Sequence, residues 1–256
     1  MLKDLKRDDW LSILNIPEER IPLVLVLRGT RNLKSYYQEY WQYFTNHLEV
    51  GTPNGILEDV FIGDLNGNSI AYASVYGAPI ASEVVHVFGV LGTRLVIQTG
   101  CCGALADGFD AGDLFFATEA FCGEGASQYY KPGGKTVKAS LDLRDWMATE
   151  SINQIKFHEG RIYTTSALFA EGMEDVEAWF RAGYSAVDME TAATFDVARY
   201  FGMDCASILY AFDNPRQKEH ILLDNKEKDE CRKSGNRQMI EITLDAIKKY
   251  GSRSVQ

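Results

Sequence analysis

A run of small and polar residues with the sequence QTGCCGAL, at positions 98–105, follows a mostly apolar stretch of the chain. We expect a strand to end here in a turn, which is where α/β proteins expose backbone N–H groups to a ligand. Gly100 and Gly103 would let the main chain approach an anion or a sugar closely, because glycine has no Cβ. The run is equally compatible with a glycine-rich corner that binds nothing, so other segments must decide.

Two carboxylates stand close together in the run VDMETAA at positions 187–193. Asp188 is suited to cap a helix that begins here, and Glu190 would be favoured by the positive end of the helix dipole. The alanines that follow indicate a buried helix, and a buried carboxylate needs partners. Glu190 is therefore either a helix-cap residue or a ligand-binding residue.

An acid and an aromatic residue also follow expected strands. Asp213 comes after the mostly apolar run 205–212, and the carboxyl ends of strands in an open α/β sheet form the usual ligand edge. The alternative for Asp213 is an Asx turn that shapes the next loop. Phe169 follows the expected strand at 161–166, and it either stacks on a planar base or belongs to the core.

Strand and helix patterns alternate along the chain and must position these residues. The Asn-Gly pair at 66–67, between two β-rich runs, predicts a hairpin. The expected strands cover residues 21–27, 60–64, 70–76, 114–118, 161–166, 184–187 and 205–211, and the expected helices cover 33–47, 80–90, 141–155, 188–201 and 226–250. This alternation predicts a three-layer α/β/α sandwich around a mixed, twisted β-sheet. We expect one domain over residues 1–256, with 1–20 as an N-terminal extension.

Composition narrows the class of protein. With 46% hydrophobic and 24% charged residues, the 256-residue chain is typical of a globular domain. Its formal net charge of −10 disfavours nucleic acid as a partner. No apolar run is long enough to span a bilayer and no signal-peptide pattern is present, so we expect a cytoplasmic protein with no membrane partner. The five cysteines lack CxxC spacing, which argues against a disulfide framework or a metal site.

The order of these segments resembles the nucleoside phosphorylase family, which contains hexameric purine nucleoside phosphorylases, uridine phosphorylases and methylthioadenosine/adenosylhomocysteine nucleosidases. The resemblance covers most of residues 20–250 and is carried by 98–105, 112–114, 124–127, 165–169, 186–193 and 213–214. It implies an α/β sandwich enzyme that cleaves the N-glycosidic bond of a nucleoside without a metal or organic cofactor. It also implies a homodimer, or a hexamer built as a trimer of dimers.

The resemblance further implies roles for individual residues. Glu190 would accept hydrogen bonds from the ribose hydroxyls, and Met189 would pack beneath the sugar. Asp213 would be the catalytic general acid, donating a proton or a strong hydrogen bond to N7 of a purine. The implied base-binding residues are Phe169, Cys102 and Gly103. An oxocarbenium-like transition state gains from a nearby anion and from protonation of the leaving base.

The nucleophile pocket departs from the family pattern. Phosphorylases of the family have an arginine where this chain has Gln98, and a serine or threonine where it has Cys101. A phosphate dianion in a dry pocket needs an opposing charge, which Gln98 does not carry. Arg28 and Arg31, which flank Gly29, are candidates to supply it. The phosphate or nucleophile pocket is thus assigned to Gly29, Arg28, Arg31, Gln98, Gly100 and Cys101.

Three functions follow from this pattern. The first is phosphorolysis to free base and ribose 1-phosphate, with phosphate as a co-substrate. The second is hydrolysis, because the start of the run 98–105 is closer to the Asn-Thr-Gly-Ser of hydrolytic members, although no water-activating glutamate occurs near residues 32–33. The third is nucleoside binding without catalysis, which the presence of both Glu190 and Asp213 opposes.

Phosphorolysis of a purine nucleoside is the preferred interpretation. Asp213 is a purine-type acid, and the glutamine and arginine that uridine phosphorylases use on uracil are absent from residues 170–175. Lys226 or Lys228 would assist the acid from the last helix, or else belong to a solvated helix face.

Overall fold

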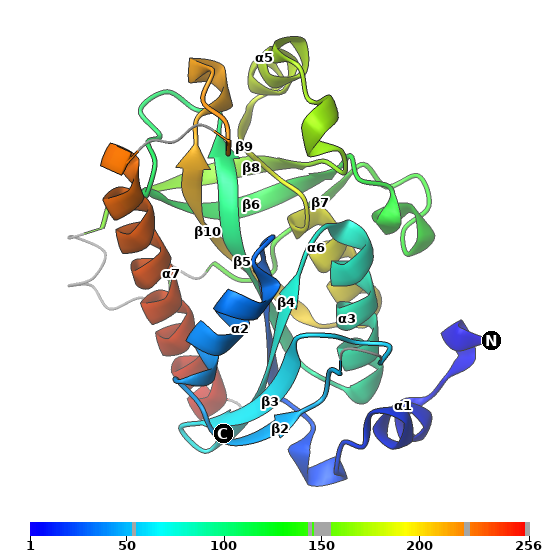
Figure 1. The fold of residues 1–256 in the computed structure, drawn as a ribbon. Helices are drawn as coiled ribbons and strands as arrows, with labels where there is room; N and C mark the ends of the chain where they lie inside the picture. Colours follow the sequence, from blue (N-terminus) through cyan, green and yellow to red (C-terminus); the bar gives the residue numbers. More distant parts are fainter. Residues whose placement is uncertain (53–54, 143–144, 146–154, 223–225, 254–256) are drawn as a thin grey trace.

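The computed structural model describes residues 1–52, 55–142, 145, 155–222 and 226–253. Its strands form one ten-stranded mixed sheet (Figure 1). They are β1 (Val24–Gly29), β2 (Thr45–Glu49), β3 (Val60–Leu65), β4 (Asn68–Val75), β5 (Leu95–Ala104), β6 (Leu114–Cys122), β7 (Thr136–Lys138), β8 (Phe157–Thr164), β9 (Tyr184–Asp188) and β10 (Asp204–Asp213). The predicted Asn-Gly hairpin is present between β3 and β4, which pair antiparallel.

Helices connect these strands. The α-helices are α1 (Arg7–Leu14), α2 (Leu33–Trp41), α3 (Ala78–Leu91), α5 (Met173–Arg181), α6 (Thr191–Tyr200) and α7 (Lys226–Arg253). Short 3₁₀ helices are η1 (Leu2–Asp4), η2 (Glu18–Arg20), η3 (Ala126–Tyr129), η5 (Leu168–Ala170) and η6 (Pro215–Gln217). Within the described ranges, no helix is both long and apolar enough to cross a membrane.

Half of the sheet closes on itself. β5 pairs in parallel with β10 along most of its length, and its last two residues, Gly103 and Ala104, pair antiparallel with β9. β10 pairs in turn with β6, β6 with β8, and β8 with β9, so these five strands form a ring. Gly103 lies between Val187 of β9 and Asp213 of β10. The closure therefore gathers the ends of strands that are far apart in sequence.

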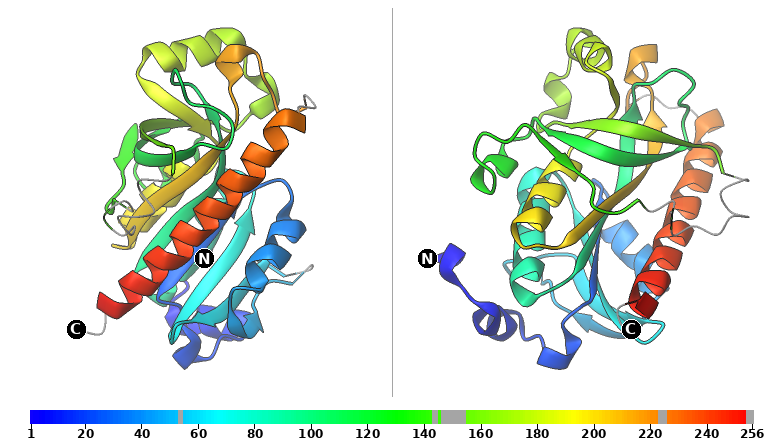
Figure 2. Two further views of the ribbon diagram at one scale, coloured as in Figure 1. Left: turned by 90° about the vertical axis from the view of Figure 1, so that its left-hand side faces the viewer. Right: turned by 180° about the vertical axis from the view of Figure 1, so that it is seen from behind.

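Helices cover both faces of the sheet (Figures 1 and 2). On one face lie α2 and α7, where Tyr40 and Met239 join Ile97 in an apolar cluster. On the other face lie α1, α3 and α6, whose buried aromatic side chains include Phe88 and Phe195. Along β1, Val24 and Val26 belong to the first cluster and Leu25 and Leu27 to the second, as the two-residue period of a strand requires. The three-layer α/β/α expectation is confirmed, and the closure of half the sheet adds to it.

The helix predicted at 33–47 is shorter than expected. It ends at Trp41, and β2 follows as an edge strand paired with β3. Phe44 is buried against Phe61, with 5.6 Å between ring centroids, and this packing turns the chain away from the helix. Tertiary contacts of an aromatic residue thus override a local helical pattern.

The run 98–105 is also different from the prediction, because it is part of a strand and not a turn. β5 continues to Ala104, since β10 and then β9 supply hydrogen-bonding partners. The start of the helix predicted at 188–201 shifts too: α6 begins at Thr191, because Asp188 still belongs to β9. Three further elements, α1, α5 and β7, were not predicted, and most of the helix predicted at 141–155 lies outside the described residues.

The N-terminal segment packs on the rest of the chain. Trp10 and Leu14 of α1 are buried in the same cluster as the side chains of α3. Its description as an extension of a single domain over residues 1–256 stays a prediction.

Candidate active site

A cavity of about 860 Å³ opens where β1, β5, β9 and β10 end. All predicted site residues except Gln98 and Gly100 line it. They are Arg28, Gly29, Arg31, Cys101, Cys102, Gly103, Phe169, Met189, Glu190 and Asp213. Strands that are far apart in the sequence, such as β1 and β10, thus contribute to one site, as expected for the ligand edge of an α/β sheet.

Gln98 and Gly100 lie behind the cavity wall. The Gln98 amide is fully buried, with Oε1 accepting a hydrogen bond from Thr194 Oγ1 at 2.7 Å and Nε2 donating to Thr99 O at 3.0 Å. Gly100 has a φ of +152°, and a Cβ there would lie 2.8 Å from Gly29 O. Gln98 therefore joins β5 to α6, and Gly100 permits the close approach of β1 and β5.

Glu190 is directed at two glycines, Gly29 in the cavity wall and Gly77 at the start of α3. The backbone N–H of Gly77 donates to Glu190 Oε1 at 2.7 Å, and a Cβ on Gly29 would lie only 2.6 Å from Glu190 Oε2. Burial and the neighbouring charge of Asp188 raise the pKa of Glu190 to about 8. Its side chain makes no capping hydrogen bond to the start of α6, so the helix-cap interpretation describes Asp188 and not Glu190.

Asp188 fixes the start of α6. Its carboxylate accepts hydrogen bonds from Thr164 Oγ1 at 2.8 Å, Thr191 Oγ1 at 2.5 Å and the Thr191 backbone N–H at 2.9 Å. Burial raises its pKa, and these hydrogen bonds oppose that rise. Asp188 thereby determines where the next residues, Met189 and Glu190, enter the cavity.

Asp213 ends β10 as a buried carboxyl group. Burial raises its pKa to about 7, against the opposing influence of the positive charge on Arg232. In the described part of the chain, its carboxyl group makes no hydrogen bond. The Asx-type contact is made instead by Asn214, whose side chain accepts from the Gln217 backbone N–H at 3.3 Å. Asp213 is therefore free to bond to a ligand.

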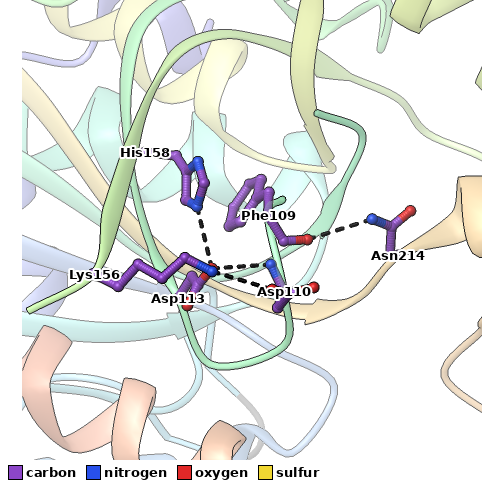
Figure 3. Close-up of polar contacts among 6 residues, drawn as sticks. All are labelled: Phe109, Asp110, Asp113, Lys156, His158 and Asn214. Atoms are coloured by element: carbon purple, nitrogen blue, oxygen red, sulfur yellow. Dashed lines mark hydrogen bonds and ion pairs between the residues drawn. The ribbon is translucent and has the colours of Figure 1, made fainter. Parts of the chain in front are cut away.

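A group of polar contacts holds the residue that follows this acid (Figure 3). Asn214 Nδ2 donates to Phe109 O at 3.3 Å, and the Phe109 ring stacks on His158 with 4.4 Å between centroids. Asp113 Oδ2 lies 3.1 Å from His158 Nε2 and 2.7 Å from Lys156 Nζ. The loop between β5 and β6 is thus tied both to β8 and to the end of β10, which positions the acid.

Arg28 is a fully buried cation on β1. Its guanidinium group lies 4.2 Å from the ring centroid of Tyr36 and 5.6 Å from that of Tyr210. Nη1 has only a weak hydrogen bond to Met239 Sδ at 3.4 Å, and Nε has no partner among the described residues. Within those residues no carboxylate forms an ion pair with it. Because a buried charge without a counterion is unfavourable, this site favours binding of an anion.

Cys101 lies in the same part of the cavity as this arginine. Burial raises the pKa of the Cys101 thiol to about 11, although the charge of Arg28 opposes the rise. The thiol is therefore neutral at physiological pH and can act only as a weak hydrogen-bond donor or acceptor.

Phe169 and Arg31 stand at the cavity mouth. Phe169 is 77% exposed, which excludes the core interpretation of this residue. The Arg31 guanidinium lies 5.1 Å from the Phe169 ring and 4.7 Å from the Tyr76 ring. Arg31 is exposed, so the two arginines that flank Gly29 have different surroundings.

The sequence of the chain matches a family model over residues 36–248. That model is described as the phosphorylase superfamily. The chain belongs to the phosphorylase superfamily.

Several named relatives share most of their length with this phosphorylase-superfamily chain. A guanosine phosphorylase of Halorubrum lacusprofundi is 29% identical over 178 residues, which cover 67% of this chain and 72% of the relative. A DeoD-type purine nucleoside phosphorylase of a Geobacillus species is 26% identical over 198 residues, covering 75% and 80%. The solved uridine phosphorylase of Vibrio fischeri superposes with a TM-score of 0.75 at 23% identity, over 91% of this chain and 95% of that one. The resemblance inferred from the sequence is confirmed.

Three residues that line the cavity or lie beside it were not predicted from the sequence. Arg232 of α7 donates from Nε to Phe212 O at 2.8 Å and lowers the pKa of Asp213. Lys228, one of two lysines considered for that role, pairs with Glu219. Arg232 lies one helical turn after Lys228, so the spacing was available as a signal.

The other two missed residues are Tyr36 and Glu171, which line the cavity. Tyr36 belongs to α2 and was assigned no role, because an aromatic residue on a helix is ordinarily part of the core. No signal in the sequence distinguished Glu171 from the acidic residues that follow it.

Proposed function

We propose that this protein cleaves the N-glycosidic bond of a purine nucleoside by phosphorolysis, releasing the free base and ribose 1-phosphate. Membership of the phosphorylase superfamily supports the reaction class. The relatives named for guanosine and purine nucleosides support a purine base. The buried, unpaired cation of Arg28 is the observation that favours phosphate over water as the nucleophile.

Arg28 supplies the charge that Gln98 lacks. Arginine stays protonated at all physiological pH values and forms strong, often bidentate bonds with phosphate oxygens. In a buried site such a bond is little screened by solvent. A water nucleophile would need a base and would bring no negative charge to the guanidinium. Gly29 and Cys101 are the neighbouring parts of the phosphate site in this proposal, and Gln98 and Gly100 support it from behind.

Glu190 and Met189 hold the ribose in this proposal. The glutamate accepts hydrogen bonds from the 2′- and 3′-hydroxyls, which stabilise its ionised form and lower its raised pKa on binding. The resulting negative charge stabilises positive charge that develops on the sugar at C1′. Met189 packs against the sugar from the same segment.

Asp213 acts as the general acid. Its pKa of about 7 leaves a large protonated fraction near neutral pH. The proton passes from Asp213 to N7 while the bond between C1′ and N9 breaks and its electron pair moves into the purine ring. A phosphate oxygen forms the new bond to C1′, so the products are the neutral base and ribose 1-phosphate. Phe169, Cys102 and Gly103 border the base in this arrangement.

The expected assembly, a homodimer or a hexamer of three dimers, is part of the same proposal. Phe169 is largely exposed at the cavity mouth, and a second copy of the chain would cover such an apolar ring. Light scattering after size-exclusion chromatography measures the mass in solution.

A nucleoside panel tests the reaction. Guanosine, inosine, adenosine, uridine and cytidine are each incubated with the protein, with and without inorganic phosphate, and free base is measured by chromatography. We expect base release from purine nucleosides only when phosphate is present. Release at the same rate without phosphate would indicate hydrolysis, and no release from any nucleoside would reject the enzymatic proposal.

A further inference from the structure

Tyr36 is an aromatic residue of the cavity wall that the proposed mechanism does not use. It belongs to α2, lines the cavity and is half-buried. The guanidinium carbon of Arg28 lies over its ring, 4.2 Å from the centroid, whereas the Tyr210 ring is 5.6 Å away. At such a distance the face of an aromatic ring attracts a cation electrostatically. Tyr36 is therefore the nearer of the two rings that contact the proposed phosphate ligand.

The remaining contacts of the Arg28 guanidinium group are weak. Its Nη1 atom lies 3.4 Å from Met239 Sδ, and a thioether sulfur is a poor acceptor. Its Nε atom has no partner in the described part of the chain. Buried charged groups are normally paired, but no described carboxylate or carbonyl oxygen hydrogen-bonds to this one. The aromatic contacts are thus left to fix the plane of the group.

The helix α2 holds the Tyr36 ring in place. Tyr40, one helical turn further along, is fully buried and stacks on Tyr72 with 4.4 Å between ring centroids. Tyr37 packs edge-on against Phe61, with 5.2 Å between centroids. Because Tyr72 belongs to β4 and Phe61 to β3, α2 is fixed to the sheet at two points. The ring of Tyr36 is therefore presented to β1 by an anchored element.

A ring on the face of a guanidinium group does not compete with an anion at its edge. The five N–H bonds of arginine form a planar fork that matches phosphate oxygens, and an aromatic ring binds the flat face. A carboxylate partner would instead occupy the same N–H groups and neutralise the charge. Stacking therefore orients a buried arginine while its edge stays available to an anion.

We propose that Tyr36 is a positioning residue, whose ring fixes the plane of the Arg28 guanidinium group so that its N–H edge faces the phosphate in the cavity. This assignment rests on the proposed function, because it takes phosphate as the anion at Arg28. The effect belongs to the ring of Tyr36 and not to its hydroxyl group, and it acts only through Arg28.

The test compares substitutions that remove the ring with one that keeps it. Tyr36→Leu and Tyr36→Met both remove the ring, and Tyr36→Phe removes only the hydroxyl group, which interacts with Tyr210. Tyr76→Leu is the matched control, because the Tyr76 ring lies 4.7 Å from the guanidinium group of Arg31. Melting curves first show which variants are folded. Calorimetric titration then gives Kd for inorganic phosphate on the free protein, and steady-state kinetics give KM for phosphate and for the nucleoside separately.

We expect Tyr36→Leu and Tyr36→Met to raise Kd and KM for phosphate by about 10-fold, as the loss of a desolvated cation–π contact implies. KM for the nucleoside should change by less than about threefold, because Arg28 does not hold the nucleoside. Tyr36→Phe and Tyr76→Leu should keep KM for phosphate within about threefold of the wild-type value. In the Arg28→Met background, Tyr36→Leu should have no further effect on phosphate, since nothing remains for the ring to position.

Three results would overturn the assignment of Tyr36. An equal rise of KM for phosphate and for the nucleoside would indicate a purely structural role. Phosphate binding as weak in Tyr36→Phe as in Tyr36→Leu would assign the effect to the hydroxyl group, and a further loss in the Arg28→Met background would show that Tyr36 acts independently of Arg28. If phosphate binds but no nucleoside is cleaved, the proposed reaction fails while the titrations still test Tyr36. A wild-type protein that binds no phosphate would reject both proposals.

Discussion

Glu190 occupies the space where a side chain on Gly29 would lie, with Oε2 only 2.6 Å from the position of a Cβ. The end of β1 and the start of α6 are thus fitted to each other through a glycine and a carboxylate. The other carboxylate oxygen is held by the Gly77 N–H. The proposed contact between Glu190 and the ribose hydroxyls therefore depends on Gly29, although Gly29 would not itself contact a hydroxyl.

We expect Gly29→Ala to displace the Glu190 carboxylate, because the added methyl group has no room. KM for the nucleoside should rise and kcat should fall, together lowering kcat/KM by about 100-fold. Steady-state kinetics at saturating phosphate measure both constants, and a melting curve verifies that the variant is folded. Wild-type kinetics in a folded Gly29→Ala protein would show that the position of Glu190 is unimportant.

Asp213→Asn should lower kcat by about 100-fold or more with little change in nucleoside binding, because it removes the general acid and keeps the shape. The acid is active when protonated, so wild-type kcat/KM should decline as pH rises above about 7. That decline should be absent from the residual activity of Asp213→Asn. An unchanged pH profile in the variant would remove Asp213 from the mechanism.

Arg28→Met should raise KM for phosphate and lower phosphorolysis by about 100-fold or more, since it removes a charge-assisted bond from a buried site. Arg31→Met is the matched comparison, because Arg31 is exposed at the cavity mouth, and its effect on KM for phosphate should be several-fold smaller. Phosphate titrations at saturating nucleoside provide both values. Equal effects of the two substitutions would mean that Arg28 is not the principal phosphate ligand.

Much of this site follows from where residues stand in the sequence. The places of Asp213 and Glu190 were predicted because the end of a strand and the start of a helix are recognisable from apolar runs and capping patterns. Their roles were implied only by the resemblance to the family. The direction of Gln98 was not predictable, because it depends on which helix covers that face of β5. Arg28 could be named as a candidate, but its lack of a counterion depends on the tyrosines of other elements.

The edge strand β2 and the position of Glu171 at the cavity could not be predicted from the sequence for a similar reason. The helical pattern through residue 47 was interrupted by packing of Phe44 on Phe61, which lies on β3. Glu171 is one of several acids between Phe169 and Val176, and only the folded loop brings it to the cavity.

The buried acids should make the free protein less stable at alkaline pH. The folded-state pKa values of Glu190, Asp213 and Glu171 are raised to about 8, 7 and 7, above the values of the unfolded chain. Their contribution to stability is therefore fully present at acidic pH, below the unfolded values, and is lost as pH rises through about 7 to 8. Urea denaturation at a series of pH values from 5 to 9 should show a declining free energy of unfolding.

Glu190→Gln should make that decline shallower, because a neutral amide replaces one of the groups that titrates. Glu174→Gln serves as the control and should keep the wild-type slope, since its side chain is exposed. A free energy of unfolding that rises between pH 6 and 9 in the wild-type protein would contradict the raised pKa values.

The identity of the nucleophile is the central claim, and the stoichiometry of phosphate consumption tests it most directly. Guanosine is incubated with the protein and inorganic phosphate, and free guanine, inorganic phosphate and ribose 1-phosphate are followed by chromatography and phosphorus NMR. We predict that one phosphate disappears and one ribose 1-phosphate forms for each guanine released. Release of guanine with free ribose, and with no loss of inorganic phosphate, would contradict phosphorolysis and the role of Arg28.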